Sequence, residues 1–199
     1  GGIESMSRVK RRGFNWSPHP ILENQFPDAY INMGLTAENV ADRWKISRVS
    51  QEEFALNSHM KSIHARDNGY FKSEICPIIN HGDSISEDGC IRETSLESMS
   101  KLAPVFREEG SVTAATSSPL TDGAVCMLVC SSDFAERNGL EPLARIVTSA
   151  VTGCSPDVMG IGPISATQKL LERSDWNIDD VDIFEINEAF SSQSIAVIN

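Results

Sequence analysis

The first part of the chain carries a helical pattern of apolar and polar positions. From Ser47 to Asn68 apolar residues recur at roughly helical spacing, and a shorter helix is predicted from Thr36 to about Lys45. Thr36 and Ser47 are the predicted N-caps, because their hydroxyls can accept hydrogen bonds from free backbone N–H groups. Asn68-Gly69 is the predicted stop, since glycine adopts the left-handed conformation that follows many helices.

The second part of the chain has continuous apolar runs instead. Residues 124–130, 142–153 and 181–187 are predicted strands, and the first and last are apolar enough to predict burial on both faces of a sheet. Short helices are predicted between them, one within residues 131–139 and one from Ser165 to about Ser174. Strands that alternate with helices predict an α/β architecture.

The first 120 residues contain more loop and helix than this α/β part. The segment up to Tyr30 is rich in Pro, Asn and Gly and is predicted to be loop. A short strand is predicted at residues 74–79, followed by a turn-rich connection over residues 81–89. The sequence therefore predicts an irregular lobe ahead of a piece of layered α/β core.

Composition and charge narrow the class of protein. A hydrophobic fraction of 40% and a charged fraction of 23% are typical of a globular protein, and no apolar run approaches the roughly 18 residues of a membrane span. The first twenty residues lack the apolar core of a signal peptide. A net charge of -11 argues against nucleic-acid binding, which favours a basic surface. Arg8, Lys10, Arg11 and Arg12 form a local basic cluster, either a solvated loop or a patch that faces an anion or an acidic partner.

The cysteines predict neither a metal site nor disulfides. The five are Cys76, Cys90, Cys126, Cys130 and Cys154. No Cys-x-x-Cys pair and no zinc-like Cys/His spacing occurs, so no metal site is predicted. Cys126 and Cys130 lie in an apolar run and are predicted core thiols, which fits a reduced, intracellular setting.

Few residues suggest chemistry on their own. His59 and His64 lie five residues apart in a predicted helix, which does not place them on one face, so a surface or packing role is expected. Asn187 and Glu188 follow the apolar run 181–187 at its carboxyl end, where ligands bind in open α/β sheets. Two interpretations stay open there: Asn187 stabilises a developing oxyanion directly or through a water, or the two residues form an ordinary helix cap.

Several longer motifs occur in one order along essentially the whole chain. They are GGIESMS, MGLTAENVA, SRVSQEEFALNSH, EICP, VTAATSSPLTDGA, MGIGP and FEINEAF. In order and spacing they resemble the thiolases, the family of acetyl-CoA acetyltransferases and 3-ketoacyl-CoA thiolases. The resemblance implies an α/β thiolase fold, a layered αβαβα core with an inserted α-rich loop domain, which this chain is expected to contain incompletely.

The resemblance also implies a division of the chain. Residues 1–7 are expected to end a strand of the N-terminal core domain, and residues 8–120 to form the loop domain that binds coenzyme A. Residues 121–142 are expected to return to the N-terminal core, and residues 143–199 to begin the C-terminal core domain.

Thiolases use a cysteine nucleophile that carries the acyl group, together with a GHP histidine and a second cysteine. The nucleophile precedes the GGIESMS motif and the other two follow NEAF, so all three are expected outside this segment, which alone is expected to be inactive. The implied function is thiolytic cleavage of 3-ketoacyl-CoA or Claisen condensation of acetyl-CoA through a cysteine-bound acyl group. The alternative is a non-catalytic acyl-CoA-binding or assembly piece.

The resemblance assigns one oxyanion residue and ten residues along the path of the substrate. Asn187 matches the NEAF asparagine, which holds a water in an oxyanion hole. The residues expected to line the acyl and pantetheine path are Met159, Ala189 and Phe190. The loop-domain residues expected near coenzyme A are Met33, Arg92, Ser98, Phe106, Ala114, Ser118 and Leu120. An arginine fits such a site because it pairs with phosphate or stacks on adenine.

Departures from the common family pattern leave the acyl chain length open. Ala115 and Thr116 stand where many members have Gly-Asn, Pro119 where Gly or Ser is common, and Asn32 where biosynthetic members have His. Coenzyme A is expected as substrate, with no cofactor. A homo-oligomer, dimer or tetramer, is expected in the cytoplasm, or in an organelle if a targeting segment lies upstream. Neither a nucleic-acid partner nor a membrane span is expected.

Overall fold

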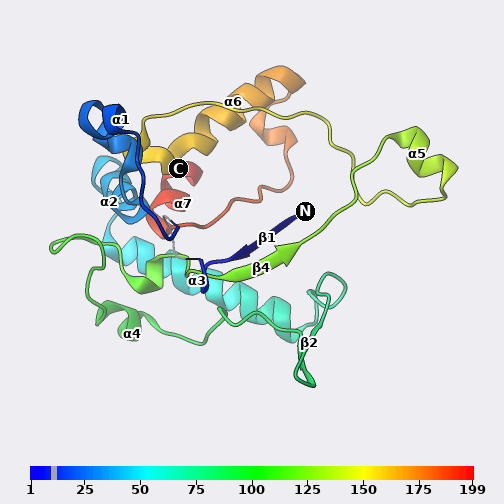
Figure 1. Ribbon diagram of the computed structural model, residues 1–199, viewed down its shortest axis with the longest axis horizontal. Helices are drawn as coiled ribbons and strands as arrows, with labels where there is room; N and C mark the ends of the chain where they lie inside the picture. The colour runs from blue at the N-terminus through cyan, green and yellow to red at the C-terminus, as the bar shows by residue number, and fades with distance from the viewer. Residues whose placement is uncertain (10–12) are drawn as a thin grey trace. The chain divides into compact units, whose positions relative to one another are not determined.

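The computed structural model describes residues 1–9 and 13–199, so most of the predicted basic cluster, residues 10–12, lies outside the described residues. The chain divides into two compact units (Figure 1). Unit 1 consists of Gly1–Tyr30, Leu120–Cys154 and Gly162–Glu185. Unit 2 consists of Ile31–Pro119, Ser155–Ile161 and Ile186–Asn199.

Unit 2 is built on three helices. These are α2 (Met33–Arg43), α3 (Arg48–Asp67) and α7 (Ser191–Ile198). Its shorter elements are β2 (Ile78–Asn80), β3 (Asp83–Ile85), α4 (Leu96–Ser100), and the 3-10 helices η2 (Ala114–Thr116) and η3 (Pro156–Ile161). Its hydrophobic core joins Val40 of α2 and Ile46 to Val158 of η3 and Ala196 of α7. Segments far apart in sequence therefore share one core.

The predicted limits of α3 are confirmed. The Ser47 hydroxyl accepts a hydrogen bond from the backbone N–H of Ser50 at 3.1 Å, and the helix ends at Asp67 with Asn68 as C-cap. Gly69 follows with φ +73°, the left-handed conformation that glycine adopts without steric cost. These local signals fix the helix because they satisfy backbone groups that its own hydrogen bonds leave free.

The predicted N-cap of α2 is wrong. The helix begins at Met33, and the Asn32 side chain accepts the capping bond from the N–H of Gly34 at 2.8 Å. Thr36 lies inside the first turn, where its hydroxyl donates to the carbonyl of Met33 at 2.7 Å. Asn and Thr are both good N-cap residues, so the choice between them depends on where the buried face of the helix begins.

A hairpin replaces the strand and connection predicted around residue 80. β2 and β3 pair antiparallel, with Ile78 opposite Ile85, and the predicted strand at 74–79 overlaps only the start of this pair. His81 and Gly82 form the turn with φ 51° and 96°. Two successive residues at positive φ suit the right-handed twist of a two-residue hairpin, which explains why the turn-rich segment also contains β3.

Unit 1 contains one two-stranded sheet and several short helices. Strand β1 (Gly2–Ser5) pairs antiparallel with β4 (Asp122–Val125). The helical elements of unit 1 are α1 (Pro20–Gln25), η1 (Pro27–Tyr30), α5 (Ser132–Arg137), α6 (Gly162–Ser174) and η4 (Ile178–Asp180). α1 and η1 correct the prediction that the whole opening segment is loop. Pro20 stands at the first position of α1, where its missing N–H costs nothing.

The helices predicted in unit 1 are present, one with a corrected start. α5 lies within residues 131–139 as predicted: the Ser131 hydroxyl accepts from the N–H of Phe134 at 3.2 Å, and Gly139 follows at φ +62°. α6 begins at Gly162, ahead of the predicted cap Ser165, and ends at Ser174 as predicted. The Ser165 hydroxyl instead pairs with that of Thr152 at 2.8 Å.

The predicted buried strands are largely wrong. Of the runs at 124–130, 142–153 and 181–187, only Ala124 and Val125, the end of β4, pair as part of a strand. Leu128 and Ile183 are 71% and 80% exposed. Cys126 and Cys130 are exposed, so they are not core thiols. An apolar run predicts a buried strand only where neighbouring strands can pair with it. Within the part of the chain that the structure describes, β1 and β4 pair only with each other.

Candidate functional site

The loop before α7 carries Asn187, Glu188, Ala189 and Phe190, and backbone contacts attach it to the segment 114–118. The N–H of Ser118 donates to the carbonyl of Ala189 at 3.0 Å, and Ser117 forms an isolated antiparallel bridge with Phe190. Residues that lie about seventy positions apart in the sequence are thus brought side by side. Three residues of the predicted substrate path, Ser118, Ala189 and Phe190, meet along this contact, and a fourth, Ala114, begins η2 just ahead of it.

A pair of aromatic rings extends the same region. Phe106 and Phe190 meet edge to face, with ring centroids 6.0 Å apart and an interplanar angle of 81°. The backbone of α2 comes close to this pair at Gly34, where an added Cβ would lie only 2.1 Å from the Phe106 ring. Gly34 follows Met33, so its missing side chain allows a third predicted site segment to approach the rings.

A buried carboxylate holds the segment that leads into residues 114–118. Glu38 of α2 is 1% exposed and accepts hydrogen bonds from the backbone N–H groups of Ser111 at 2.9 Å and Val112 at 3.0 Å. Gln51 of α3 donates to the Ser111 hydroxyl at 2.9 Å. Glu38 lies in the MGLTAENVA motif, and sequence analysis did not single it out. The available signal was a charged residue on the face of a helix that is otherwise apolar or small.

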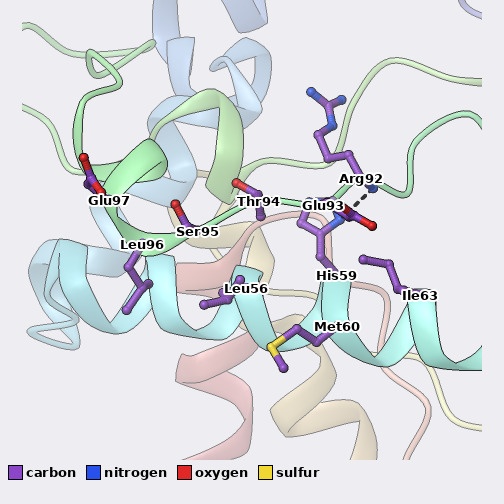
Figure 2. Close-up of a pocket in the computed structure, with 10 residues that line it drawn as sticks. All are labelled: Leu56, His59, Met60, Ile63, Arg92, Glu93, Thr94, Ser95, Leu96 and Glu97. Atoms are coloured by element: carbon purple, nitrogen blue, oxygen red, sulfur yellow. Dashed lines mark hydrogen bonds between the residues drawn. The ribbon is translucent and has the colours of Figure 1, made fainter.

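A pocket of about 620 Å³ lies beside α3 (Figure 2). One wall consists of Leu56, His59, Met60 and Ile63 of α3, and the other is the run 92–97. Figure 2 shows the guanidinium of exposed Arg92 directed away from α3, while its backbone N–H donates to Nδ1 of His59 at 3.5 Å. The pocket thus combines an apolar wall with a cation at its rim.

His59 lies between charges of opposite sign. Its burial is the largest effect that lowers the pKa of the imidazole, and the positive charge of Arg92 lowers it further. The carboxylate of Glu188 acts in the opposite direction and raises that pKa. The prediction of a surface or packing role for His59 did not anticipate this position beside Arg92. His64 lies farther along α3, where it packs against Tyr70 with ring centroids 6.0 Å apart.

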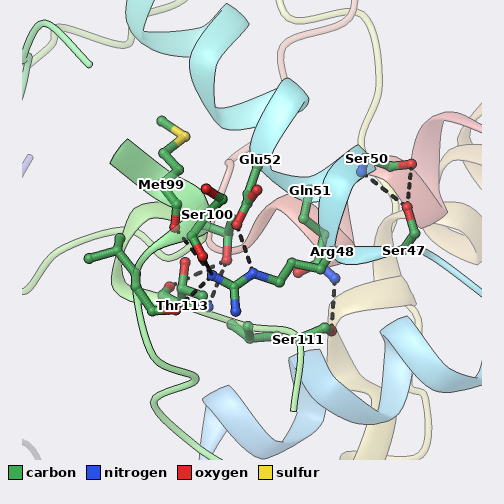
Figure 3. Close-up of polar contacts among 12 residues, drawn as sticks. Ser47, Arg48, Ser50, Gln51, Glu52, Met99, Ser100, Ser111 and Thr113 are labelled. Carbon is green, nitrogen blue, oxygen red and sulfur yellow. Dashed lines mark hydrogen bonds and ion pairs between the residues drawn. The ribbon is translucent and has the colours of Figure 1, made fainter. Parts of the chain in front are cut away.

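Arg48 attaches the second wall of the pocket to α3 (Figure 3). Its Nη2 donates to the carbonyls of Met99 at 3.2 Å and Ser100 at 3.1 Å, the last two residues of α4, and to that of Leu102 at 2.6 Å just beyond it. Its Nε pairs with Glu52 at 2.7 Å. A cation at the carboxyl end of a helix satisfies carbonyls that the helix leaves free. Arg48 therefore fixes α4, whose residues Leu96 and Glu97 line the pocket.

Three of the predicted site residues take part in none of these contacts. Ser98 of α4 hydrogen-bonds with its cap Ser95, at 3.0 Å between hydroxyls, and is exposed. Met159 of η3 is 46% exposed. Leu120 belongs to unit 1 and is 70% exposed.

Polar contacts attach η3, which carries Met159, to α2. The side-chain amide of Asn39 donates to the carbonyl of Asp157 at 3.0 Å, and Arg43 pairs with the Asp157 carboxylate. Asn39 also accepts from Arg107 at 3.0 Å. Hydrogen bonds from Ser155 and then from Arg43 lower the pKa of Asp157 below its ordinary value.

Two other kinds of feature are absent from the described residues, a metal-binding cluster and a membrane-spanning helix. No group of three or more His, Cys, Asp or Glu side chains there could hold a metal ion. None of the helices described is long and apolar enough to cross a membrane.

Comparison with known families gives a consistent result for both parts of the sequence. The family described as thiolase, N-terminal domain, matches residues 1–133, and that described as thiolase, C-terminal domain, matches residues 140–199. The chain therefore belongs to the thiolase family.

Individual relatives agree with this assignment. The acetyl-CoA acetyltransferase of Shinella zoogloeoides is 44% identical over 214 residues, which cover 99% of this chain and 54% of the relative. The 3-ketoacyl-CoA thiolase of Marinobacter nauticus is 43% identical and matches 100% of this chain and 52% of its own length. The chain spans about half the length of the curated relatives it matches.

Solved structures confirm the predicted α/β thiolase fold. The dimeric peroxisomal thiolase of Saccharomyces cerevisiae superposes with a TM-score of 0.88 at 35% identity, over 99% of this chain and 52% of that one. The acetyl-CoA acetyltransferase of Bacillus anthracis gives a TM-score of 0.85 at 38% identity, over 99% and 54%.

Proposed function

We propose that this protein is a thiolase-type acyltransferase, which cleaves 3-ketoacyl-CoA with free coenzyme A into two acyl-CoA thioesters, or in the reverse direction condenses two acetyl-CoA molecules with release of coenzyme A, through a cysteine-bound acyl group. The observation that carries the proposal is the contact between the loop 187–190 and the segment 114–118, with the rings of Phe106 and Phe190 beside it. In this proposal the oxyanion candidate Asn187, two residues before Ala189 in the same loop, acts together with the small residues Ala114 and Ser118, which leave room for a narrow ligand. Membership of the thiolase family supports the same assignment.

The pantetheine arm of coenzyme A fits the segment 114–118. Ala114 and Ser118 carry small side chains, so an extended thioester can approach the backbone closely there. The aromatic pair Phe106 and Phe190 supplies apolar surface for the acyl group. Asn187, two residues before the backbone contact at Ala189, would stabilise charge on the thioester oxygen, directly or through a water.

The nucleotide end of coenzyme A is assigned to the pocket beside α3. Arg92 at its rim supplies a positive charge for phosphate or a planar group for adenine, and Leu56, Met60 and Ile63 supply an apolar wall. In this proposal Arg48 keeps α4 against α3 and so preserves the pocket.

The covalent step is assigned to residues outside this sequence. None of its five cysteines matches the position of the nucleophile or of the second cysteine in thiolases. The segment therefore contributes binding and oxyanion stabilisation. A non-catalytic acyl-CoA-binding or assembly piece is the second candidate function, because the proposed binding residues would serve it equally.

The assembly and compartment follow the same proposal. We expect a homodimer or tetramer, in keeping with the dimeric state named for the yeast relative. We expect coenzyme A to act as substrate, with no bound cofactor. The expected compartment is the cytoplasm, or an organelle if a targeting segment lies upstream.

The test is a thiolysis assay of the full-length protein with acetoacetyl-CoA and coenzyme A. Turnover supports the acyltransferase, whereas tight binding of coenzyme A without turnover supports the non-catalytic alternative. Arg92→Ala should raise KM for coenzyme A substrates by an amount equivalent to about 1.5–3 kcal/mol, the value of one charge-assisted hydrogen bond. The same variant should leave KM unchanged for a pantetheine thioester that lacks the nucleotide.

Arg145→Ala serves as the matched control, because Arg145 is an exposed arginine of unit 1, outside the proposed site. Equal losses with the coenzyme A and pantetheine substrates would show that Arg92 acts on the fold and not on the nucleotide.

A further inference from the structure

The loop 187–190 is held from two sides within unit 2. On one side its backbone pairs with Ser117 and Ser118. On the other side the Ser58 hydroxyl of α3 donates to the carboxylate of Glu188. Among the described residues this is the one side-chain hydrogen bond made by residues 187–190.

The backbone contacts alone leave Asn187 free to change direction. They fix Ala189 and Phe190, which lie after Glu188, whereas Asn187 lies before it and is exposed. A bond from the Glu188 side chain restricts the one residue between Asn187 and the fixed part of the loop. Removing that bond should widen the range of orientations open to the Asn187 amide.

The support for Glu188 is itself a rigid element. Ser58 lies near the middle of α3, a helix of 20 residues with a hydrogen-bonded cap at Ser47. The next residue, His59, accepts the backbone N–H of Arg92 and is influenced electrostatically by Glu188. Two consecutive residues of α3 therefore contact the Asn187 loop and the rim of the Arg92 pocket.

We propose that Glu188 is a positioning residue, which through its hydrogen bond to Ser58 holds Asn187 in the orientation that stabilises the oxyanion. The proposal rests on the function assigned above to Asn187. It assigns Glu188 no contact with the substrate. Its role is to limit the motion of a neighbouring side chain, and small displacements of such a group lower the rate of the chemical step more than substrate affinity.

A double-mutant cycle on the full-length protein tests this role. Asn187→Ala, Glu188→Ala and the double variant are compared by kcat and KM in acetoacetyl-CoA thiolysis. Glu188→Ala should lower kcat about ten- to a hundredfold, the scale of a misplaced catalytic group, and change KM less than about twofold. In the Asn187→Ala background the same change should have almost no further effect, because the group being positioned is gone.

Two further variants separate positioning from a general effect on folding. Glu188→Gln keeps an acceptor for Ser58 and should retain most of the kcat, and Ser58→Ala should reproduce much of the loss. Glu53→Ala, which removes an exposed carboxylate from the same helix, should leave kcat unchanged. Melting temperatures of all variants are measured in parallel to check that each one folds. If Glu188→Ala does not fold, Glu188→Gln and Ser58→Ala still test the positioning role.

The possible outcomes distinguish this proposal from the proposed function. If the wild-type protein shows no turnover, both are overturned. Suppose instead that the wild type is active and that the fold loss of kcat in the double variant equals the product of the losses in Asn187→Ala and Glu188→Ala. Then the two residues act independently, and only the positioning role is overturned. A lower melting temperature with normal kcat would likewise reduce Glu188 to a structural residue.

Discussion

The core of unit 2 and the apolar runs of unit 1 contain the same kinds of side chain in opposite environments. Val40 in α2 is fully buried, whereas Leu128 in the run after β4 is 71% exposed. Only Leu128 belongs to a run that the sequence predicted to be buried, whereas the segment of Val40 was predicted simply as a helix. Burial therefore depends on which other segments can cover a residue, and hydrophobicity supplies only the tendency.

Long-range polar contacts also differ between unit 2 and unit 1. In unit 2 the side chains of Glu38, Arg48 and Asn39 hydrogen-bond to backbone groups far away in sequence. In unit 1 the corresponding long-range contacts are fewer and exposed, such as the carboxylate of Asp122 with Ser5 and Ser7. Unit 2 is thus stabilised by interactions in which each side chain fixes a separate segment.

The largest expected effect comes from Glu38→Ala. The change leaves the buried N–H groups of Ser111 and Val112 without an acceptor and should destabilise the protein by about 3 kcal/mol. Chemical denaturation of the purified variant measures the free energy of unfolding. Glu97→Ala, which removes an exposed carboxylate from unit 2, should cost less than about 0.5 kcal/mol. Similar values for the two variants would refute the assigned importance of the buried carboxylate.

A matched pair of core and surface truncations tests the comparison directly. Val40→Ala should cost about 2 kcal/mol, because it removes two methyl groups from a closed core. Leu128→Ala removes a larger apolar side chain but should change stability by less than about 0.5 kcal/mol. The same denaturation measurement applies. A cost for Leu128→Ala above that for Val40→Ala would show that residues 126–130 are covered in solution.

The smallest expected effect is a pH dependence in the stability of the β1–β4 pairing. Hydrogen bonds from the hydroxyl and then the backbone N–H of Ser7 lower the pKa of Asp122 below its ordinary value. The folded state therefore favours the ionised carboxylate of Asp122. The stabilisation of the folded state by this carboxylate is fully present above the unfolded pKa of about 3.9. That contribution is lost as pH falls through the lower pKa of the folded state.

The measurement is the amide chemical shift of Ser7 and Ser5 in a pH titration by NMR. Both signals should report one titration below pH of about 3.9, and Asp122→Asn should abolish it. A midpoint above the ordinary aspartate value would contradict the assigned hydrogen bonds.

In the candidate site, residues that are neighbours in sequence were predicted, whereas contacts between residues far apart in sequence were not. The motifs placed Asn187, Ala189 and Phe190 together, because they are adjacent in one motif. Sequence analysis did not anticipate that Ser58 would hold Glu188, or that His59 would lie beside Arg92, because each pair joins residues more than thirty positions apart. The roles assigned to the site residues stay predictions until the variants are measured.

The sequence alone determined the family, the extents of α3 and α5, and the candidate residues of the loop before α7. These depend on local signals, such as the hydroxyl of Ser47 and the glycine at position 69, which act within one turn of backbone. Tertiary structure decided which apolar runs are buried, which residue caps α2, and which side chains support the Asn187 loop. Strand pairing and burial each require a partner segment, and a single run of sequence does not specify where that partner lies.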